Sequence, residues 1–324
     1  MDTLEAIKQP VAGELDKFED HFRQVMKSDK MLLDKITHYI IRRKGKQMRP
    51  MFVFLSAALC GPVSQPTHIA ASMIEMLHTA TLVHDDVVDD AHLRRGFFSI
   101  NALWKNKIAV LVGDYLLSRG LLVSVENNQF ELLKITSRAV QEMSEGELLQ
   151  QQKSRLLDIT EEVYYEIITQ KTASLIAACC EAGAASAGAD LALREKLNRF
   201  GHLAGLAFQV KDDIFDYGDG SNIGKPAGID IQERKMTLPL IYALRNAPSD
   251  QRRHALQTIR RYNTDTRRVR ELVEWVHERG GIDYAVKKMH EFRDQAVAIL
   301  NEFEPSSARE SLIRLVDYTI ARQK

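Results

Sequence analysis

Two clusters of aspartates carry the most distinctive chemistry in this sequence. The first is HDDVVDD, in which Asp85, Asp86, Asp89 and Asp90 follow an otherwise apolar run within the stretch 72–96. On a helix, Asp85 and Asp89 would project from the same face and repel each other. A divalent cation bound between them would turn this repulsion into binding, and carboxylate oxygens are ligands that suit Mg²⁺.

The second cluster repeats the spacing of the first. Asp212, Asp213 and Asp216 lie in FQVKDDIFDY, again on an apolar background. A single cluster of this kind is more often a solvated helix end than a metal site. Two copies instead favour two helices that face each other across a metal-lined cavity.

Basic residues recur beside each acidic or flexible segment, although the chain carries 44 basic and 44 acidic residues and has no net charge. This pattern predicts a local site for a highly anionic ligand, bound partly by Mg²⁺ and partly by cations. Diphosphates fit such a site well. The basic residues are Lys46, Arg49, Arg94, Arg95, Lys171, Lys225 and Lys235.

The composition of the 324 residues, 45% hydrophobic and 27% charged, is that of a globular protein. Zero net charge argues against general affinity for nucleic acids and against adhesion to anionic membranes. The apolar run 51–60 is too short to span a bilayer, so no transmembrane segment is expected. The N-terminus does not resemble a signal peptide. Cys60, Cys179 and Cys180 indicate reduced core thiols and a cytoplasmic protein.

The elements that position these residues are expected to be helices. Long Ala- and Leu-rich segments are separated by a break at 92–99 and a long Gly-rich loop at 217–234. We expect Gly146 to allow close packing or a bend, and Gly201 and Gly205 to allow close helix contact. The prediction is an all-α, single-domain helical bundle over residues 1–324 around a central cavity. The expected helices cover 1–30 (interrupted at Pro10 and Gly13), 31–41, 51–60, 68–90, 109–120, 130–153, 160–180, 237–246, 250–262, 266–279, 282–303 and 307–322.

The motifs together resemble the trans-type polyprenyl diphosphate synthases, which elongate isoprenoid chains head to tail. The resemblance runs nearly end to end through GKQMRP, EMLHTATLVHDDVVDDAHLRRG, GDYLL, EGELLQ, QKTASL, GLAFQVKDDIFDY and GKPAGIDIQERKMTLP. Seven motifs in the same order make the resemblance specific. One departure is Lys44, where the family usually has the first Gly of a GGKxxRP loop, and it concerns only the shape of that loop.

The resemblance implies a role for each motif. Three Mg²⁺ ions would bind Asp85, Asp86, Asp89, Asp212, Asp213 and Asp216. The allylic diphosphate would also contact Arg94, Lys171, Thr172, Gln209, Lys225 and Lys235. Isopentenyl diphosphate would occupy a pocket formed by Lys46, Arg49, His78 and Arg95. The catalytic set would be Asp85, Asp86, Asp89, Lys171, Asp212 and Lys235.

In the implied reaction, neutralisation of the leaving diphosphate lets the C–O bond ionise to an allylic carbocation. The isopentenyl double bond attacks C1 of the cation, and a proton leaves C2. Small side chains at Ala80 and Thr81, upstream of Asp85, imply an open tunnel and a medium-to-long, octaprenyl-like product. Leu77 and Ile74 lie deeper on the same face. The family also implies a homodimer.

Other interpretations fit parts of the pattern. A shorter-chain synthase would share every motif, and a terpene cyclase would share the Asp cluster but not the second diphosphate pocket. A non-catalytic synthase subunit would typically lack intact Asp clusters. Two ExxH pairs, Glu75 with His78 and Glu274 with His277, are also compatible with a di-iron bundle, but that site leaves the Asp clusters unexplained.

Overall fold

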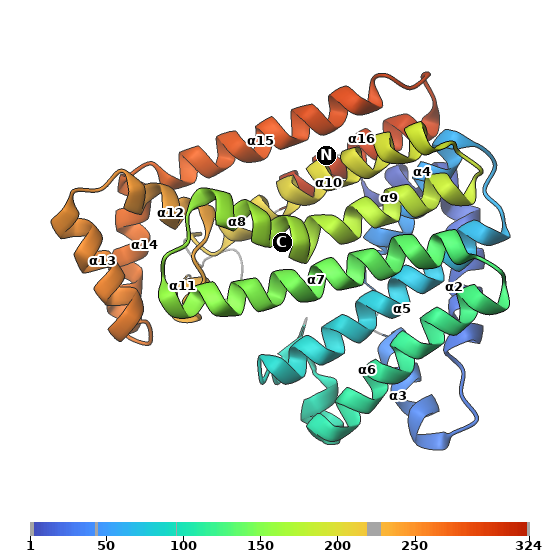
Figure 1. Cartoon of the computed structure of the whole chain (residues 1–324), viewed down its shortest axis with the longest axis horizontal. Coiled ribbons are helices and arrows are strands. Elements are labelled where there is room, and N and C mark those ends of the chain that lie inside the picture. Colours follow the sequence, from blue (N-terminus) through green and yellow to red (C-terminus); the bar gives the residue numbers. More distant parts are fainter. Residues whose placement is uncertain (1–2, 43–44, 95, 219–227, 323–324) are drawn as a thin grey trace.

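The computed structural model describes residues 3–42, 45–94, 96–218 and 228–322, and this part of the chain is almost wholly helical (Figure 1). The all-α prediction is therefore confirmed. The elements are α1 (Leu4–Lys8), a 3-10 turn (Gln9–Val11), α2 (Ala12–Met26), α3 (Met31–Arg42), α4 (Met48–Cys60), α5 (Gln65–Val88), β1 (Leu93–Arg94), β2 (Phe97–Phe98), α6 (Ile100–Glu126), α7 (Phe130–Leu156), α8 (Glu161–Ile168), a π-helical turn (Thr169–Ala173), α9 (Ser174–Ser186), α10 (Leu191–Phe215), α11 (Ile229–Gln232), α12 (Leu238–Arg245), α13 (Ser249–Arg261), α14 (Thr266–Glu278), α15 (Gly281–Leu300) and α16 (Ser307–Ala321).

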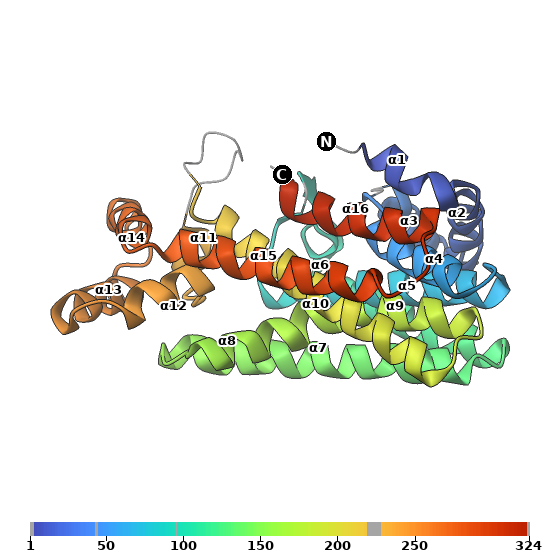
Figure 2. The same ribbon diagram turned by 90° about the horizontal axis from the view of Figure 1, so that it is seen from above.

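The long helices α7, α9, α10 and α15 run along the longest axis of the molecule, while α13 and α14 form its far end (Figures 1 and 2). Two hydrophobic clusters fill the interior, one around α4, α5, α6 and α9 and the other around α8, α12, α14 and α15. α10 contributes to both clusters, with Phe200 in the first and Val210 in the second. This continuous helix supports the expected single domain, which stays a prediction.

Glycines set how closely the central helices approach one another. A Cβ atom at Gly201 would lie 2.7 Å from the carbonyl oxygen of Ile176, and one at Gly205 would lie 2.6 Å from the Cα of Ala173. The predicted close helix contact at these two glycines is therefore confirmed. Gly146 has the same role on α7, because a Cβ atom there would lie 2.8 Å from the Cβ of Gln170.

Several boundaries differ from those expected. Gly13 does not interrupt the N-terminal helix but lies in the first turn of α2, where no neighbouring atom restricts it. The expected helix 160–180 is broken by the π-helical turn at 169–173. The break at 92–99 is a short antiparallel hairpin in which Leu93 pairs with Phe98. The predicted loop 217–234 contains the short helix α11, and its residues 219–227 lie outside the described part.

The helix α6 bears on the expectation that the chain has no transmembrane segment, which stays a prediction. Its 27 residues are long and apolar enough to span a membrane by length and composition alone. In the structure α6 packs along α5, and a core helix of a globular protein passes the same test. Its outer side keeps several large apolar side chains exposed, including Leu111 at 56% and Val125 at 46%.

Candidate active site

The first Asp cluster occupies the C-terminal end of α5. The helix begins with a capping box between Ser64 and Thr67, and it ends at Asp89, whose N–H donates to the Asp85 carbonyl. Asp86 is buried, whereas Asp89 is exposed. The last turn contains no basic residue. Because a helix C-terminus carries partial negative charge, carboxylates there cost stability unless a cation is bound.

The second cluster occupies the same position on α10, whose C-cap is Asp216. Both oxygens of Asp216 accept backbone N–H groups, from Ile229 at 2.8 Å and from Asp230 at 3.1 Å. These two bonds fix the start of α11 to the end of α10. Asp212 accepts a hydrogen bond from the guanidinium of Arg322 on the C-terminal segment.

Asp213 is buried within a network of side chains. Its Oδ2 accepts a hydrogen bond from the Tyr164 hydroxyl at 2.6 Å, and its Oδ1 accepts one from the Gln209 amide at 2.9 Å. The Oε1 of Gln209 in turn accepts the Thr172 hydroxyl at 2.8 Å. The structure thus brings together three predicted site residues, Thr172, Gln209 and Asp213. Each carboxylate oxygen keeps a further lone pair for another partner.

The carboxyl groups of this cluster favour an added positive charge. Burial, reinforced by the nearby Asp230, raises the pKa of Asp213 to about 8 and that of Asp216 to about 7. Burial also raises the pKa of Asp212, although the Arg322 guanidinium opposes the effect. Buried, crowded carboxylates bind either a proton or a cation. An all-oxygen donor set at two helix C-termini fits a hard divalent cation.

The π-helical turn places Lys171 at the site. Such turns interrupt α-helices at functional positions because they re-aim side chains. Gly146 on α7 permits the contact, since a Cβ atom there would lie 2.9 Å from the backbone N of Lys171. The ammonium group of Lys171 forms an ion pair with Glu147. Burial raises the pKa of the Glu147 carboxyl, but Lys171, Gln151 and Lys235 together lower it below its usual value.

Lys235 lies in the segment that follows the second Asp cluster. Its Nζ lies 2.5 Å from an oxygen of Glu233, and its backbone N–H donates to the Asp230 carbonyl at 2.8 Å. Burial lowers the pKa of Lys235, but Glu233, Asp230 and Asp89 raise it by more. The charge of Asp89 in the first cluster therefore helps to keep Lys235 protonated.

The GKQMRP segment contacts α16, and the C-cap residue of α16 contacts the second cluster. The Nζ of Lys46 lies 5.4 Å above the ring of Tyr318, which is one turn before Arg322. Residues four apart share a helix face, so Lys46 and the Arg322–Asp212 pair lie on the same side of α16. Arg49 is half-buried on α4 and His78 is buried on α5.

Three other predicted contacts are described only in part or not at all. Arg94 pairs with Phe97 in the β1–β2 hairpin that follows the first cluster. Arg95 and Lys225 lie outside the described residues.

His84 packs at the α5–α6 contact, since a Cβ atom at Gly113 would lie 2.1 Å from its Nε2.

The residues predicted to set product length line the inner side of α5. Ala80 is fully buried and Leu77 is 3% exposed, while the hydroxyl of Thr81 donates to the His78 carbonyl at 2.8 Å. Gly120 of α6 lies opposite Leu77, because a Cβ atom there would be 3.5 Å from it. The position of these residues between α5 and α6 is compatible with a tunnel, which stays a prediction.

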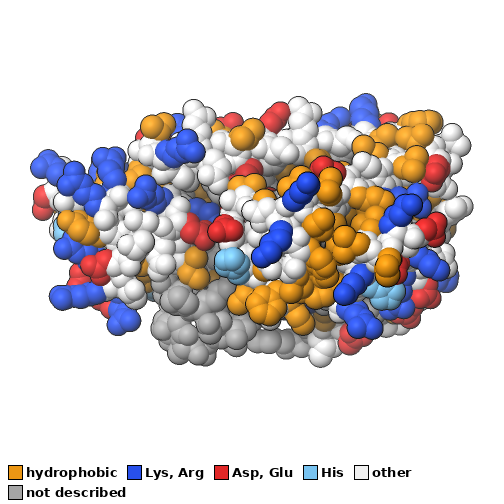
Figure 3. Space-filling model, turned by 90° about the horizontal axis from the view of Figure 1, so that it is seen from below, with side chains coloured by type: hydrophobic (Ala, Val, Ile, Leu, Met, Phe, Trp, Pro, Cys, Tyr) orange, Lys and Arg blue, Asp and Glu red, His pale blue; other side chains and the backbone are white. Residues whose placement is uncertain are grey.

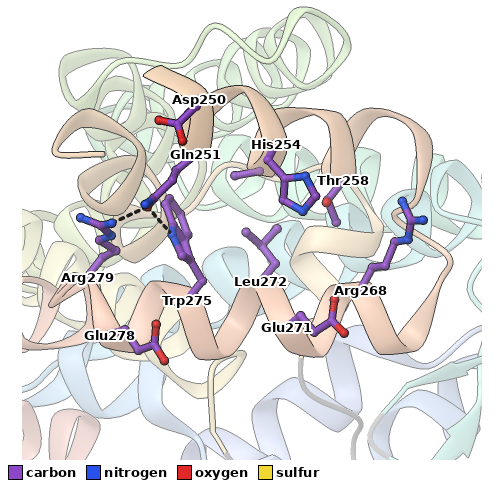
Figure 4. Close-up of a pocket in the computed structure, with 11 residues that line it drawn as sticks. Asp250, Gln251, His254, Thr258, Arg268, Glu271, Leu272, Trp275, Glu278 and Arg279 are labelled. Atoms are coloured by element: carbon purple, nitrogen blue, oxygen red, sulfur yellow. Dashed lines mark hydrogen bonds between the residues drawn. The ribbon is translucent and has the colours of Figure 1, made fainter. Parts of the chain in front are cut away.

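Two cavities stand out, and neither is lined by an Asp-cluster residue. The first, about 460 Å³ in volume, lies between α13 and α14 around Trp275 and His254 (Figure 4). There Gln251 accepts hydrogen bonds from Trp275 at 3.3 Å and from Arg279. The second lies between α3 and Trp104. The central cavity between the clusters stays a prediction, and among the described residues no three His, Cys, Asp or Glu side chains are grouped as metal ligands.

The structure adds site residues that the sequence reasoning missed. Tyr164 is buried in the core, and it also donates a hydrogen bond to Asp213. Glu147 pairs with Lys171, Asp230 and Glu233 flank Lys235, and Arg322 holds Asp212. Glu147 lies in the motif EGELLQ, and Asp230 and Glu233 lie in GKPAGIDIQERKMTLP. Neither motif reveals which partner each side chain contacts.

An all-α bundle that gathers two acidic helix ends with lysines fits a class of enzyme that handles anionic substrates with divalent cations. The model of the polyprenyl synthetase family matches residues 30–276. The all-trans-nonaprenyl-diphosphate synthase (geranyl-diphosphate specific) of Rhodobacter capsulatus is 37% identical over 324 residues, which cover 99% of each chain. The octaprenyl diphosphate synthase of Escherichia coli is 33% identical over 322 residues, again 99% of each.

A solved structure agrees with these sequence relationships. The polyprenyl synthase of Caulobacter crescentus, complexed with calcium and isoprenyl diphosphate, superposes with a TM-score of 0.90 at 36% identity. The match covers 99% of this chain and 98% of that one. The chain belongs to the polyprenyl synthetase family, a family that uses Mg²⁺, and it is therefore an enzyme of the prenyltransferase class.

Proposed function

We propose that this enzyme condenses isopentenyl diphosphate head to tail with an allylic diphosphate to make a medium-to-long, octaprenyl-like trans-polyprenyl diphosphate. The observation that carries the proposal is the pair of acidic helix ends on α5 and α10. The nonaprenyl and octaprenyl synthases among the relatives support the chain length.

The six carboxylates of the two clusters would hold Mg²⁺, and we expect three ions. When bound, the ions would neutralise diphosphate oxygens and stabilise the leaving group. Asp85 and Asp89 lie at the end of α5, and Asp212 and Asp216 lie at the end of α10. Binding of the metal ions between the clusters would therefore require both helices. Asp86 and Asp213 are buried and would orient the cluster from beneath.

The lysines would complete the allylic diphosphate site. Lys171 and Lys235 would donate hydrogen bonds to diphosphate oxygens that gain charge as the C1–O bond breaks. Both are already held in place by carboxylates, Lys171 by Glu147 and Lys235 by Glu233. Thr172 and Gln209 would also contact the diphosphate. They are hydrogen-bonded to each other, and Gln209 donates to Asp213. Arg94 and Lys225 are the remaining proposed contacts.

The second substrate would lie on the opposite side of the first cluster. Lys46, Arg49, His78 and Arg95 are the proposed contacts of isopentenyl diphosphate. Its double bond would attack C1 of the allylic cation, the new C–C bond would form, and the proton from C2 would pass to the released diphosphate. No protein nucleophile is needed in this scheme.

The growing tail would run between α5 and α6, past Thr81, Ala80 and Leu77. Because Ala80 and Thr81 are small, no bulky side chain of α5 at these two positions would block the tail next to the first Asp cluster. The same two helices would also form a homodimer interface. Large apolar side chains on the outer side of α6, among them Leu111 and Leu122, are exposed and gather on one face (Figure 3). The three free thiols suit the cytoplasm.

Chromatography of the product tests the proposal. The purified chain is incubated with farnesyl diphosphate, isopentenyl diphosphate and Mg²⁺, and we expect a linear trans-polyprenyl diphosphate. A cyclic hydrocarbon would instead identify a cyclase, a product that stops after one or two additions would identify a short-chain synthase, and no turnover by the pure chain would favour a non-catalytic subunit.

A matched pair of variants links the activity to the clusters. Asp85→Asn is expected to abolish elongation because it removes a proposed Mg²⁺ ligand. Asp90→Asn is the control, since Asp90 is the one aspartate of the first cluster that is not a proposed Mg²⁺ ligand, and its φ of 49° is a conformation that Asn tolerates. Equal activity of the two variants would contradict the assignment.

A further inference from the structure

The helical hairpin of α13 and α14 carries a strong positive charge in a chain that is neutral overall. Residues 249–270 contain seven arginines, no lysine and two carboxylates. Figure 3 shows Lys and Arg side chains gathered over this end of the molecule, away from the apolar face of α6. The zero net charge of the whole chain conceals this segregation and therefore does not exclude adhesion to anionic membranes.

Most of the charge is concentrated at the tip of the hairpin. Arg260 and Arg261 end α13, the turn follows, and Arg267 and Arg270 begin α14. All four are exposed. Cations in the first turn of α14 oppose the helix dipole, so helix stability does not explain them. Arg253, which lies two turns before Arg260 on the same face of α13, extends the charged surface.

Within the described residues, the side chains of four of these arginines have neither an ion pair nor a hydrogen bond: Arg253, Arg260, Arg261 and Arg270. We refer to them as the arginine tip. The other arginines are used locally. Arg252 donates to the carbonyls of Leu244 and Arg245, and Arg268 lies 3.7 Å above the ring of Tyr262. The arginine tip therefore offers charge that the fold itself does not use.

We propose that the arginine tip docks the enzyme on an anionic lipid surface. This proposal rests on the proposed function for the choice of partner, because a long polyprenyl tail partitions into a bilayer at about 0.8 kcal/mol per buried CH₂ group. A surface that attracts the enzyme to anionic lipids would shorten the path of this insoluble product. Each arginine near such a surface contributes about 1 kcal/mol.

The hairpin turn is bonded to the active-site segment. Asn263 in the turn donates to the Gln232 carbonyl at 2.5 Å, and Arg234 donates to the Arg260 carbonyl at 3.2 Å. Lys235 follows directly in the same segment. Docking through the arginine tip would therefore bring the residues after the second Asp cluster close to the lipid surface.

The hairpin is less suited to nucleic acid. Single strands are bound by exposed aromatic side chains together with cations. Here Tyr262 is covered by Arg268, and Trp275 lies in the cavity of Figure 4, where it donates to Gln251. Charge without available aromatic surface fits a lipid headgroup layer better.

Vesicle co-sedimentation tests the proposal without requiring turnover, so it can fail independently of the proposed function. The full-length protein is mixed with vesicles of phosphatidylcholine alone or with phosphatidylglycerol added. We expect binding to the anionic vesicles only, and a steep loss of binding as salt is raised from 50 to 300 mM, which are about the concentrations where screening becomes strong.

A charge-removal variant assigns the binding to the arginine tip. The variant changes Arg253, Arg260, Arg261 and Arg270 to Gln. Its matched control changes Lys27, Lys30, Arg138 and Arg199 to Gln, four exposed cations on other elements. The tip variant should bind anionic vesicles on the order of a thousand-fold more weakly, whereas the control should bind like the wild type.

Further readouts decide what a loss of binding means. Both variants should keep the wild-type circular dichroism and the wild-type elongation rate in detergent, because none of the changed residues touches the site. Equal binding to neutral vesicles, or equal loss in both variants, would overturn the proposal. Binding to a mixed-sequence oligonucleotide but not to anionic vesicles would do so as well.

Discussion

Gly146→Ala is the sharpest test of how the fold positions Lys171. The substitution adds one methyl group to α7 at its contact with the π-helical turn. The new Cβ atom would lie 2.8 Å from the Cβ of Gln170 and 2.9 Å from the backbone N of Lys171. Ordinary contacts begin near 3.4 Å, so the turn and α7 must separate by about 0.6 Å.

The expected magnitude comes from comparison with a glycine in open space. Gly13 of α2 has no atom within 4 Å of an added Cβ, so Gly13→Ala should stabilise the protein by about 0.4–1 kcal/mol. The helix-propensity gain is largely common to both variants. What distinguishes Gly146→Ala is overpacking, which typically costs about 1–3 kcal/mol.

Catalysis should be affected more than stability. Misplacing a catalytic group by about 1 Å costs on the order of a hundred-fold in rate, so a shift of about 0.6 Å at Lys171 should lower kcat roughly ten-fold. Urea unfolding measures the free energies of unfolding of both variants, and steady-state elongation measures kcat and KM. The fall should appear mainly in kcat, because Lys171 is proposed to act on the leaving group.

The result that would refute this reasoning is specific. If Gly146→Ala were as stable as Gly13→Ala and kept wild-type kcat, the contact between α7 and the π-helical turn would not position Lys171. A loss of stability with normal kcat would show that the contact is structural alone.

Three further predictions follow from buried groups. Ala80→Phe should shorten the product if a tunnel passes Ala80, with little loss of stability. If the fully buried Ala80 instead faces packed core, the variant should lose about 1–3 kcal/mol and leave the product length unchanged, which would exclude the tunnel. Tyr164→Phe should destabilise the protein by about 0.5–1.5 kcal/mol in urea and raise the Mg²⁺ concentration needed for half-maximal activity, because Asp213 loses a hydrogen bond of 2.6 Å; unchanged values of both would contradict that role. Burial raises the pKa of Cys60 to about 11 and that of Cys180 to about 12, so native protein should react slowly with a thiol reagent at pH 8 and react fully when unfolded; rapid labelling of the folded protein would contradict this burial.

The sequence predicted the helices and the Asp clusters because both signals are local. Apolar periodicity and turn residues mark where a helix begins and ends, and the DDxxD spacing is legible within one turn. Even so, the expected position of Asp85 and Asp89 within a helix was only partly correct, because Asp89 is the C-cap of α5.

The partners of these aspartates could not be predicted, because they depend on packing between distant elements. Tyr164 precedes Asp213 by 49 positions and Arg322 follows Asp212 by 110. The π-helical turn has no propensity signal of its own. It depends on Gly146 and Gly205, which approach it from two other helices.

The location of the two clusters supplies a physical reason for the proposed binding of Mg²⁺. α5 and α10 both end in carboxylates without a basic residue in the last turn, so each helix dipole adds to the repulsion. Burial of Asp213 and Asp216 removes water that would otherwise screen them. The sequence alone shows the acidic residues, but only their place at two helix C-termini shows that the fold itself makes this end of the bundle electronegative. Lys171 and Lys235 are each paired with a carboxylate, so they offset little of that potential, and added cations are needed before two diphosphates can approach.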